Sequence, residues 1–244
     1  MPPQPPMVRV ETPGTKPVVT YVLLGLTVLI YLMQMGSESL FKLDYPFLIG
    51  GKFNELILKG EFWRLITPVF LHGSIVHVAF NMYALFVVGP SLERAYGHWR
   101  FTALYFLSAY AGNVLSFFLS PNPSLGSSTA VFGLVAAQAV FFYQNRKLFG
   151  VQARAILTNS LVVIAINLFY GLQPGSRIDN FGHLGGLIGG AFFAWLGGPL
   201  WKVEGFPPAS LKVVDQREQN QVIMAGTGLI LMVTILAAAK FFMN

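Results

Sequence analysis

Residues 179–200 read DNFGHLGGLIGGAFFAWLGGPL, an apolar stretch that opens with a polar pair and carries His183. Glycines recur at every fourth position, at Gly182, Gly186 and Gly190, and make two overlapping GxxxG units. In a membrane helix such units let a second backbone approach closely, because no side chain stands between the two helices. The stretch therefore predicts a membrane helix packed tightly against a neighbour, with the histidine at the border of the glycine groove.

The composition of the whole chain also indicates a membrane protein. Of the 244 residues, 54% are hydrophobic and 11% are charged, and the mean hydropathy is +0.59, whereas soluble domains carry about 25% charged residues. The 22 Phe and 9 Tyr exclude a disordered chain. The absence of cysteine excludes a disulfide scaffold and thiol chemistry. The net charge of +6 comes from basic residues scattered between apolar runs, which argues against nucleic acid as a partner.

Several stretches approach the length of about 20 apolar residues that a membrane helix needs. We place them at 17–36, 72–92, 100–119, 127–145, 155–171, 179–200 and 222–243. The expected fold is an all-α membrane protein with a six-helix core over residues 17–200 and a seventh C-terminal transmembrane helix within 222–244. Residues 1–16 are expected to form a Pro-rich cytoplasmic N-terminal segment whose opening stretch, MPPQPPM, is disordered, and residues 201–221 are expected to form a linker.

The distribution of Lys and Arg predicts the orientation, because cytoplasmic loops carry an excess of both. With the N-terminus inside, the cytoplasmic segments hold most of the 16 basic residues, namely Arg9, Lys16, Arg94, Arg100, Arg146, Lys147, Arg154, Lys202, Lys212 and Arg217. The outer segments hold Lys42, Lys52, Lys59, Arg64, Arg177 and Lys240. We therefore expect a cytoplasmic N-terminus. The second, fourth and sixth helices then start at the outer face, so residues in their first turns lie at a similar depth.

Polar side chains gather in those first turns, and polar groups inside a membrane are costly enough to mark candidate functional sites. The second helix is expected to carry His72, His77 and Asn81. The fourth opens with Gly126-Ser127-Ser128-Thr129 and continues with a stripe of small residues, Ala130, Gly133 and Ala137. If this stripe meets the glycine groove of the sixth helix, Ser128 and His183 come together.

A serine and a histidine at one depth can form a nucleophile and base, the imidazole taking the hydroxyl proton. Ser128 would begin a helix, where free N–H groups and the helix dipole favour an oxyanion. Asn81 and His77 could donate further hydrogen bonds to it. Taken singly, each feature has a simpler interpretation, because membrane serines bond to carbonyls, histidines pack as polar groups and GxxxG units serve packing. Their combination at one depth favours catalysis.

Five elements between Phe62 and Pro199 resemble, in order, the motifs of the rhomboid intramembrane serine proteases. They are Trp63-Arg64, His72-x4-His77-x3-Asn81-Met82, Glu93-x3-Gly97, Gly126-Ser127-Ser128-Thr129-Ala130-Val131-Phe132-Gly133 and Asn180-Phe181-Gly182-His183-Leu184-Gly185-Gly186. The resemblance implies a catalytic dyad of Ser128 and His183. It also implies an oxyanion hole formed by His77, Asn81 and the Ser128 N–H, and neither a cofactor nor a metal.

The resemblance assigns further residues to supporting roles. Trp63 and Arg64 would anchor a partly membrane-embedded first outer loop over about 37–71, and Glu93 would be a hydrogen-bonding residue at a helix end, followed by a turn at Gly97. Phe132 falls where the family places an aromatic ring against the histidine. Thr129 departs from the pattern, because the family usually has a small residue after the serine; we interpret it as a change in pocket shape.

The implied substrates are single-pass transmembrane proteins, cut near the outer membrane face at small residues and reaching the site beside the fifth helix. A bacterial inner membrane fits the compact chain. Other intramembrane proteases fit poorly, because the chain lacks an HExxH zinc motif and paired membrane aspartates. A transporter should show internal repeats, and none is evident. The remaining alternative is a catalytically inactive rhomboid-like protein that binds membrane clients.

Overall fold

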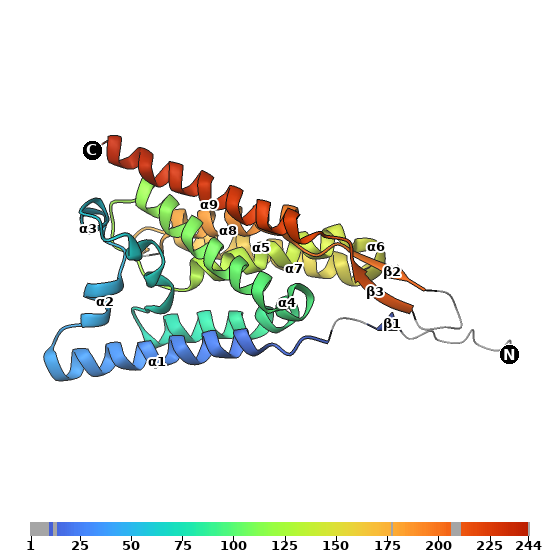
Figure 1. Ribbon diagram of the computed structural model, residues 1–244. Coiled ribbons are helices and arrows are strands. Elements are labelled where there is room, and N and C mark those ends of the chain that lie inside the picture. The colour runs from blue at the N-terminus through green and yellow to red at the C-terminus, as the bar shows by residue number, and fades with distance from the viewer. Residues whose placement is uncertain (1–9, 12–13, 177, 206–210, 244) are drawn as a thin grey trace.

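The computed structural model describes residues 10–11, 14–176, 178–205 and 211–243, which form a bundle of long helices with a small sheet at one end (Figure 1). Most of the predicted N-terminal segment, Arg177, and residues 206–210 of the predicted linker lie outside the described residues. In chain order the elements are β1 (Val10–Glu11), α1 (Val18–Phe41), α2 (Tyr45–Gly50), α3 (Asn54–Leu58), η1 (Phe62–Leu65), η2 (Thr67–Phe70), α4 (Ile75–Leu119), α5 (Ser128–Gln144), α6 (Arg146–Phe149), α7 (Val151–Gly171), α8 (Asn180–Gly197), β2 (Trp201–Glu204), β3 (Leu211–Asp215) and α9 (Gln219–Phe242).

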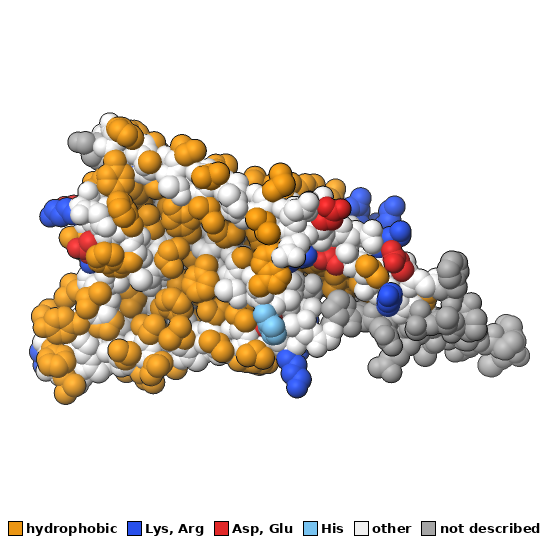
Figure 2. Space-filling view, viewed as in Figure 1, with side chains coloured by type: hydrophobic (Ala, Val, Ile, Leu, Met, Phe, Trp, Pro, Cys, Tyr) orange, Lys and Arg blue, Asp and Glu red, His pale blue; other side chains and the backbone are white. Residues whose placement is uncertain are grey.

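The surface of the bundle is that of a membrane protein. Among the described residues, α1, α4, α7 and α9 are long and apolar enough to cross a membrane, and α5 is a shorter apolar helix. Figure 2 shows hydrophobic side chains along the sides of the bundle and charged side chains at its two ends. This confirms the predicted helical membrane fold. The count of seven crossings stays a prediction.

Helix α4 joins two stretches that the sequence placed in separate helices. Its backbone leaves the helical region at Gly97, with φ 75° and ψ 166°, so the element consists of two arms that meet at a sharp turn. Glycine adopts a positive φ without the steric cost that a Cβ would add. The turn predicted after the second helix is therefore present, and the helical arms extend up to it on both sides.

The start of α4 differs from the predicted one. The side chain of Ser74 accepts a hydrogen bond from the His77 N–H at 3.1 Å and so caps the helix, which begins at Ile75. His72, which the sequence analysis placed inside this helix, lies in the loop before it. The predicted start of this helix was wrong because the spacing of apolar residues does not show which residue caps the first turn.

Helices α4, α5 and α8 pack on one another in the centre of the bundle. Helix α1 packs on α4, α9 on α4 and α8, and α7 mainly on α5. Within α7 only Ala153 and Ser160 are buried, so this helix presents most of its side chains to the surroundings. The centre of the bundle therefore holds the three helices that carry the predicted site.

The predicted linker contains a small sheet that the sequence analysis missed. Strands β2 and β3 pair in antiparallel fashion, and β1 pairs in parallel with the other side of β3. Strands of two to five residues leave too short an alternation for a sequence pattern to predict. The missed strands mean that part of the stretch over 201–221 is structured and that the chain is not purely α-helical.

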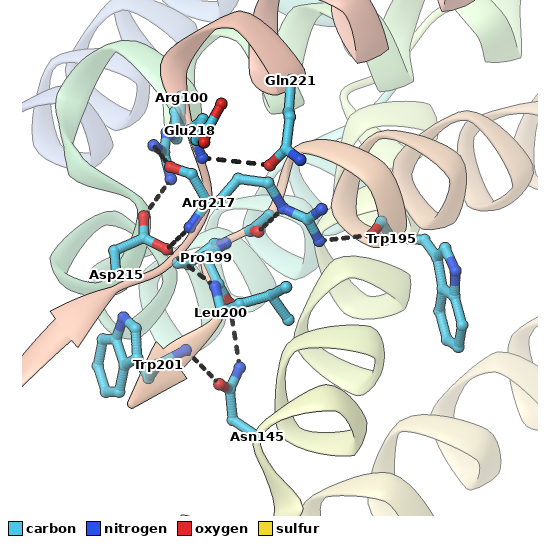
Figure 3. Close-up of polar contacts among 11 residues, drawn as sticks. Arg100, Asn145, Trp195, Pro199, Leu200, Trp201, Asp215, Arg217, Glu218 and Gln221 are labelled. Carbon is cyan, nitrogen blue, oxygen red and sulfur yellow. Dashed lines mark hydrogen bonds and ion pairs between the residues drawn. The ribbon is translucent and has the colours of Figure 1, made fainter. Parts of the chain in front are cut away.

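A polar cluster ties the sheet to the helix ends (Figure 3). Asp215 accepts a hydrogen bond from the Arg100 guanidinium at 2.5 Å, and Arg217 donates to the carbonyl oxygens of Trp195 and Gly198 at 3.0 Å each. These bonds connect β3 and the start of α9 with α4 and the end of α8. These bonds thus fix the start of α9, the seventh predicted helix, to α4 and α8 at one end of the bundle.

Candidate active site

The side chains of Ser128 and His183 meet between α5 and α8. Ser128 Oγ lies 2.8 Å from His183 Nε2, although the two residues are 55 positions apart in the chain. Ser128 is the first residue of α5, and His183 lies in the first turn of α8, whose N-cap is Asp179. The two helices therefore bring their N-terminal turns together, as the sequence analysis expected.

Close contact between backbones makes this approach possible. A Cβ added to Gly186 would lie 2.0 Å from the Thr129 carbonyl oxygen, and one added to Gly190 would lie 2.4 Å from the Gly133 Cα. Real Cβ atoms do not come so close, so only glycine fits at either position. The predicted contact between the small-residue stripe and the glycine groove is present through Gly133, with Thr129 rather than Ala130 against Gly186.

The His183 ring is held by packing. The Phe132 ring lies against it with ring centroids 4.1 Å apart and planes 15° apart, and the histidine side chain is buried. Its second ring nitrogen, Nδ1, has no hydrogen-bond partner among the described residues. The arrangement is thus a pair of residues without a carboxylate to orient the imidazole.

Gly126 lets His77 approach the serine. Its φ is 127°, a left-handed value that side chains disfavour, and an added Cβ would lie 2.8 Å from His77 Cε1. The same Cβ position lies 3.7 Å from Ser128 Oγ. The imidazole of His77 therefore lies on the N-terminal side of Ser128, next to the turn that enters α5.

Asn81 is buried one turn further along α4 than His77. Its side-chain Nδ2 donates to the His77 carbonyl oxygen at 3.0 Å, which is a bond within its own helix. The structure thus brings His77 beside the Ser128 turn, and it gives the Asn81 amide nitrogen a backbone partner instead of one in the Ser128–His183 pair.

The Thr129 side chain faces the neighbouring helices. Its Cβ lies 2.7 Å from where a Gly112 Cβ would stand, and its Cγ2 lies 3.1 Å from the corresponding position at Gly182. Its hydroxyl is buried and has no hydrogen-bond partner among the described residues. The extra bulk of threonine is therefore accommodated by two glycines, one in α4 and one in α8.

The first outer loop is held by Trp63 and Arg64. Arg64 is buried and donates to the carbonyl oxygens of Gly51 and Leu48 at 2.8 Å each, and to Glu61 Oε2 at 2.7 Å. The Trp63 indole N–H donates to the carbonyl oxygen of residue 49 at 3.0 Å. The loop begins later than expected, because α1 continues to Phe41, and it contains α2, α3, η1 and η2.

Glu93 lies at the other end of the bundle and caps α1. Its carboxylate accepts from the N–H groups of Val19 and Thr20 at 2.8 and 2.7 Å, from the Thr20 hydroxyl at 2.6 Å and from His98 Nδ1 at 2.6 Å. Pro17 precedes α1 and supplies no side-chain cap. The buried carboxylate of α4 therefore satisfies N–H groups that the first turn of α1 leaves open.

His72 and Ser127 form a contact that the sequence analysis did not assign. His72 Nε2 lies 3.2 Å from Ser127 Oγ and 3.4 Å from the Ser127 backbone nitrogen, while the His72 N–H donates to Gln34 Oε1 at 2.9 Å. Burial, with a smaller effect of His77, lowers the pKa of His72 to about 3, so its ring is neutral and can accept at Nε2. The contact fixes the residue before Ser128. The sequence could have predicted this contact only if the motif that contains His72 and the motif that contains Ser127 had been considered together.

Comparisons with known proteins identify the family of this chain. Residues 59–200 match the family model of the rhomboid domain. The chain is 43% identical over 179 residues to the rhomboid protease GluP of Bacillus subtilis (strain 168), which covers 73% of this chain and 34% of that protein. It is 35% identical over 159 residues to RHOMBOID-like protein 9, chloroplastic, of Arabidopsis thaliana. That match covers 65% of this chain and 36% of the relative. It is 41% identical over 149 residues to Rhomboid-like protease 1 of Toxoplasma gondii. That match covers 58% of this chain and 49% of the relative.

The rhomboid match covers more than half of the chain, and the chain therefore belongs to the rhomboid family. Its relatives include proteins named as a rhomboid protease and a rhomboid-like protease. The chain spans between about a third and a half of the length of the relatives described above. The resemblance drawn from the motifs is confirmed at the level of the family.

Proposed function

We propose that this chain is an intramembrane serine endopeptidase that hydrolyses single-pass transmembrane proteins near the outer face of the membrane. The observation that carries the proposal is the 2.8 Å distance between Ser128 Oγ and His183 Nε2. This distance suits transfer of the hydroxyl proton to the imidazole. Ser128 is the nucleophile and His183 is the general base.

The first step forms a tetrahedral intermediate. Ser128 Oγ bonds to the carbonyl carbon of the scissile peptide while its proton passes to His183 Nε2. The carbonyl oxygen becomes an oxyanion. The Ser128 N–H is available to it, because the first N–H groups of a helix have no acceptor within the helix. His77 beside Gly126 donates a second hydrogen bond, and Asn81 donates a third when its amide turns from the His77 carbonyl.

The second step releases the amine product. His183 returns the proton to the leaving nitrogen, the C–N bond breaks, and an ester links the substrate acyl group to Ser128. Water, deprotonated by the same imidazole, then hydrolyses this ester and restores the serine. Because Phe132 and not a carboxylate orients His183, we expect slow turnover.

The substrate reaches the site from the membrane, beside α7. Only two side chains of α7 are buried, so this helix is the least enclosed of the long helices and supports lateral access. A substrate helix must expose a carbonyl that its own hydrogen bonds hide, so weakly helical segments with small residues are cut best. We place the protein in a bacterial inner membrane with a cytoplasmic N-terminus, because the basic residues favour the end of the bundle that carries the sheet.

The alternative function is client binding without cleavage, as in an inactive rhomboid-like protein. The Ser128–His183 contact favours the protease, since a client-binding protein needs neither side chain. The test uses the full chain in detergent and a fluorescent single-pass transmembrane reporter. We expect cleavage by the wild type and none by Ser128→Ala or His183→Ala. An intact reporter, bound with equal affinity by all three folded proteins, would favour client binding.

A further inference from the structure

Lys52 is a buried lysine in the first outer loop, between α2 and α3. Its side chain is completely inaccessible to solvent, which is rare for lysine. Its Nζ donates to Ser116 Oγ at 2.9 Å, to the Ser120 carbonyl oxygen at 3.2 Å and to the Asn122 carbonyl oxygen at 2.9 Å. An ammonium has three N–H groups, so all three find an oxygen acceptor. The ammonium is thus bound at the end of α4.

Ser116 passes this interaction on to the helix that carries His183. Since its hydroxyl oxygen accepts from Lys52, its proton is free to donate, and it donates to Asp179 Oδ2. Asp179 is the N-cap of α8: its Oδ1 accepts the Gly182 N–H at 2.9 Å and its carbonyl oxygen accepts the His183 N–H at 2.9 Å. A continuous chain of hydrogen bonds therefore runs from Lys52 to the first turn of α8.

The backbone of Lys52 also contacts the segment that leads to the serine. Its N–H donates to the Ser124 carbonyl oxygen at 3.0 Å, and the Ser124 N–H donates back to the Lys52 carbonyl oxygen at 3.2 Å. Ser124 lies four residues before Ser128, in the segment that enters α5. Lys52 is thus linked directly to the segment that leads to Ser128 and, through Ser116, to the first turn of α8.

We propose that Lys52 is a positioning residue for the dyad, and that its ammonium, acting through Ser116 and Asp179, sets the distance between His183 and Ser128. This inference rests on the proposed protease function. The role requires the charged form, because a neutral amine has only two N–H groups and would leave one of its three oxygens without a donor. The carboxylate of Asp179 would then also lose the positive charge of Lys52, with which it interacts.

The environment of Lys52 makes this role dependent on pH. Burial lowers the pKa of Lys52 from 10.5 to about 8, with Asp179 of α8 acting to raise it and Lys240 of α9 to lower it further. Because the folded protein holds this proton less tightly than the unfolded chain, deprotonation of Lys52 does not by itself destabilise the fold. Activity is therefore expected to decline as pH rises through about 8 while the protein stays folded.

The test compares Lys52→Met with the wild type and with Lys59→Met, a matched change at an exposed lysine of the same loop. For each, kcat and KM on the fluorescent reporter are measured from about pH 6 to about pH 10, together with the rate of Ser128 labelling by a fluorophosphonate. We expect Lys52→Met to lower kcat and the labelling rate roughly tenfold near pH 7, with an unchanged KM. It should also lack the decline above about pH 8, whereas Lys59→Met should match the wild type.

Ser116→Ala interrupts the same chain with a smaller change in volume and decides the outcome if Lys52→Met fails to fold. We expect it to lower kcat and the labelling rate severalfold at constant KM. A folded Lys52→Met or Ser116→Ala protein with the kcat and pH profile of the wild type would overturn the positioning role and leave the proposed protease function standing. A folded wild type that neither cleaves nor reacts with the fluorophosphonate would overturn both.

Discussion

The ring of Phe132 lies almost parallel to the imidazole of His183, with the two centroids 4.1 Å apart. Both side chains are buried, and His183 Nδ1 has no partner among the described residues. In the proposed mechanism, the stacking contact therefore replaces the hydrogen-bonded carboxylate of a catalytic triad, which holds the imidazole toward the nucleophile.

Removal of the stacked ring should slow the reaction more than it weakens substrate binding. We expect Phe132→Leu, which keeps apolar volume, to lower kcat roughly fivefold at constant KM, since an aromatic contact contributes about 1 kcal/mol beyond its buried area. Phe132→Tyr should stay close to the wild type. Steady-state cleavage of the fluorescent reporter measures both constants. A Phe132→Leu protein with full kcat would show that the ring only fills space.

The glycine contact between α5 and α8 should be intolerant of a single methyl group. A Cβ at Gly186 would lie 2.0 Å from the Thr129 carbonyl oxygen, so we expect Gly186→Ala to destabilise the fold by about 3 kcal/mol and to abolish cleavage. Gly228 of α9 has no atom within 4 Å of the corresponding position, and Gly228→Ala should be neutral. Thermal unfolding in detergent compares them. Equal midpoints for the two variants would contradict the contact.

The hydroxyl of Thr129 should be dispensable. It is buried without a hydrogen-bond partner among the described residues, while the rest of the side chain packs toward Gly112 and Gly182. Thr129→Val keeps this shape and removes the unpaired polar group, so we expect kcat within about twofold of the wild type and an equal or slightly higher stability. A tenfold or greater loss of kcat at unchanged stability would instead mean that the hydroxyl takes part in the reaction.

Glu93 should act on stability and not on the chemistry. Glu93→Gln replaces one carboxylate oxygen by an NH₂ group facing N–H donors, so we expect a loss of about 2–4 kcal/mol and easier proteolysis at the start of α1. Protein that remains folded should keep the KM of the wild type. Glu38→Gln, at an exposed glutamate near the end of α1, is the matched control and should leave the unfolding midpoint unchanged.

The features that could be predicted from the sequence are those in which a residue type at a given spacing has one dominant structural role. Gly186 and Gly190 at GxxxG spacing favour a close helix contact, and Ser128 and His183 come together if that contact is with the small-residue stripe of the fourth predicted helix. The turn at Gly97 was predicted from the resemblance to the rhomboid motifs, and the positive φ of Gly97 agrees with it. These local patterns predicted most of the helices and the centre of the site.

Contacts between distant segments could not be predicted in this way. The Lys52 side chain reaches Ser116 across 64 positions, and His72 reaches Ser127 across 55. Neither lysine nor histidine prefers one partner strongly enough for sequence spacing to select it. The charge count even placed Lys52 among ordinary outer-loop residues, whereas the structure buries it. The strands β2 and β3 were missed for the related reason that pairing, and not local pattern, stabilises so short a sheet.

The most direct test of the central assignment is to locate the nucleophile. Wild type, Ser128→Ala and His183→Ala proteins are treated with a fluorophosphonate, and the modified peptide is identified by mass spectrometry while reporter cleavage is followed in parallel. The Ser128–His183 account predicts a single adduct on Ser128 in the wild type, none in Ser128→Ala, and strongly reduced labelling in His183→Ala, with cleavage lost in both variants. Cleavage that persists in a folded Ser128→Ala protein, or an adduct on another serine, would contradict it.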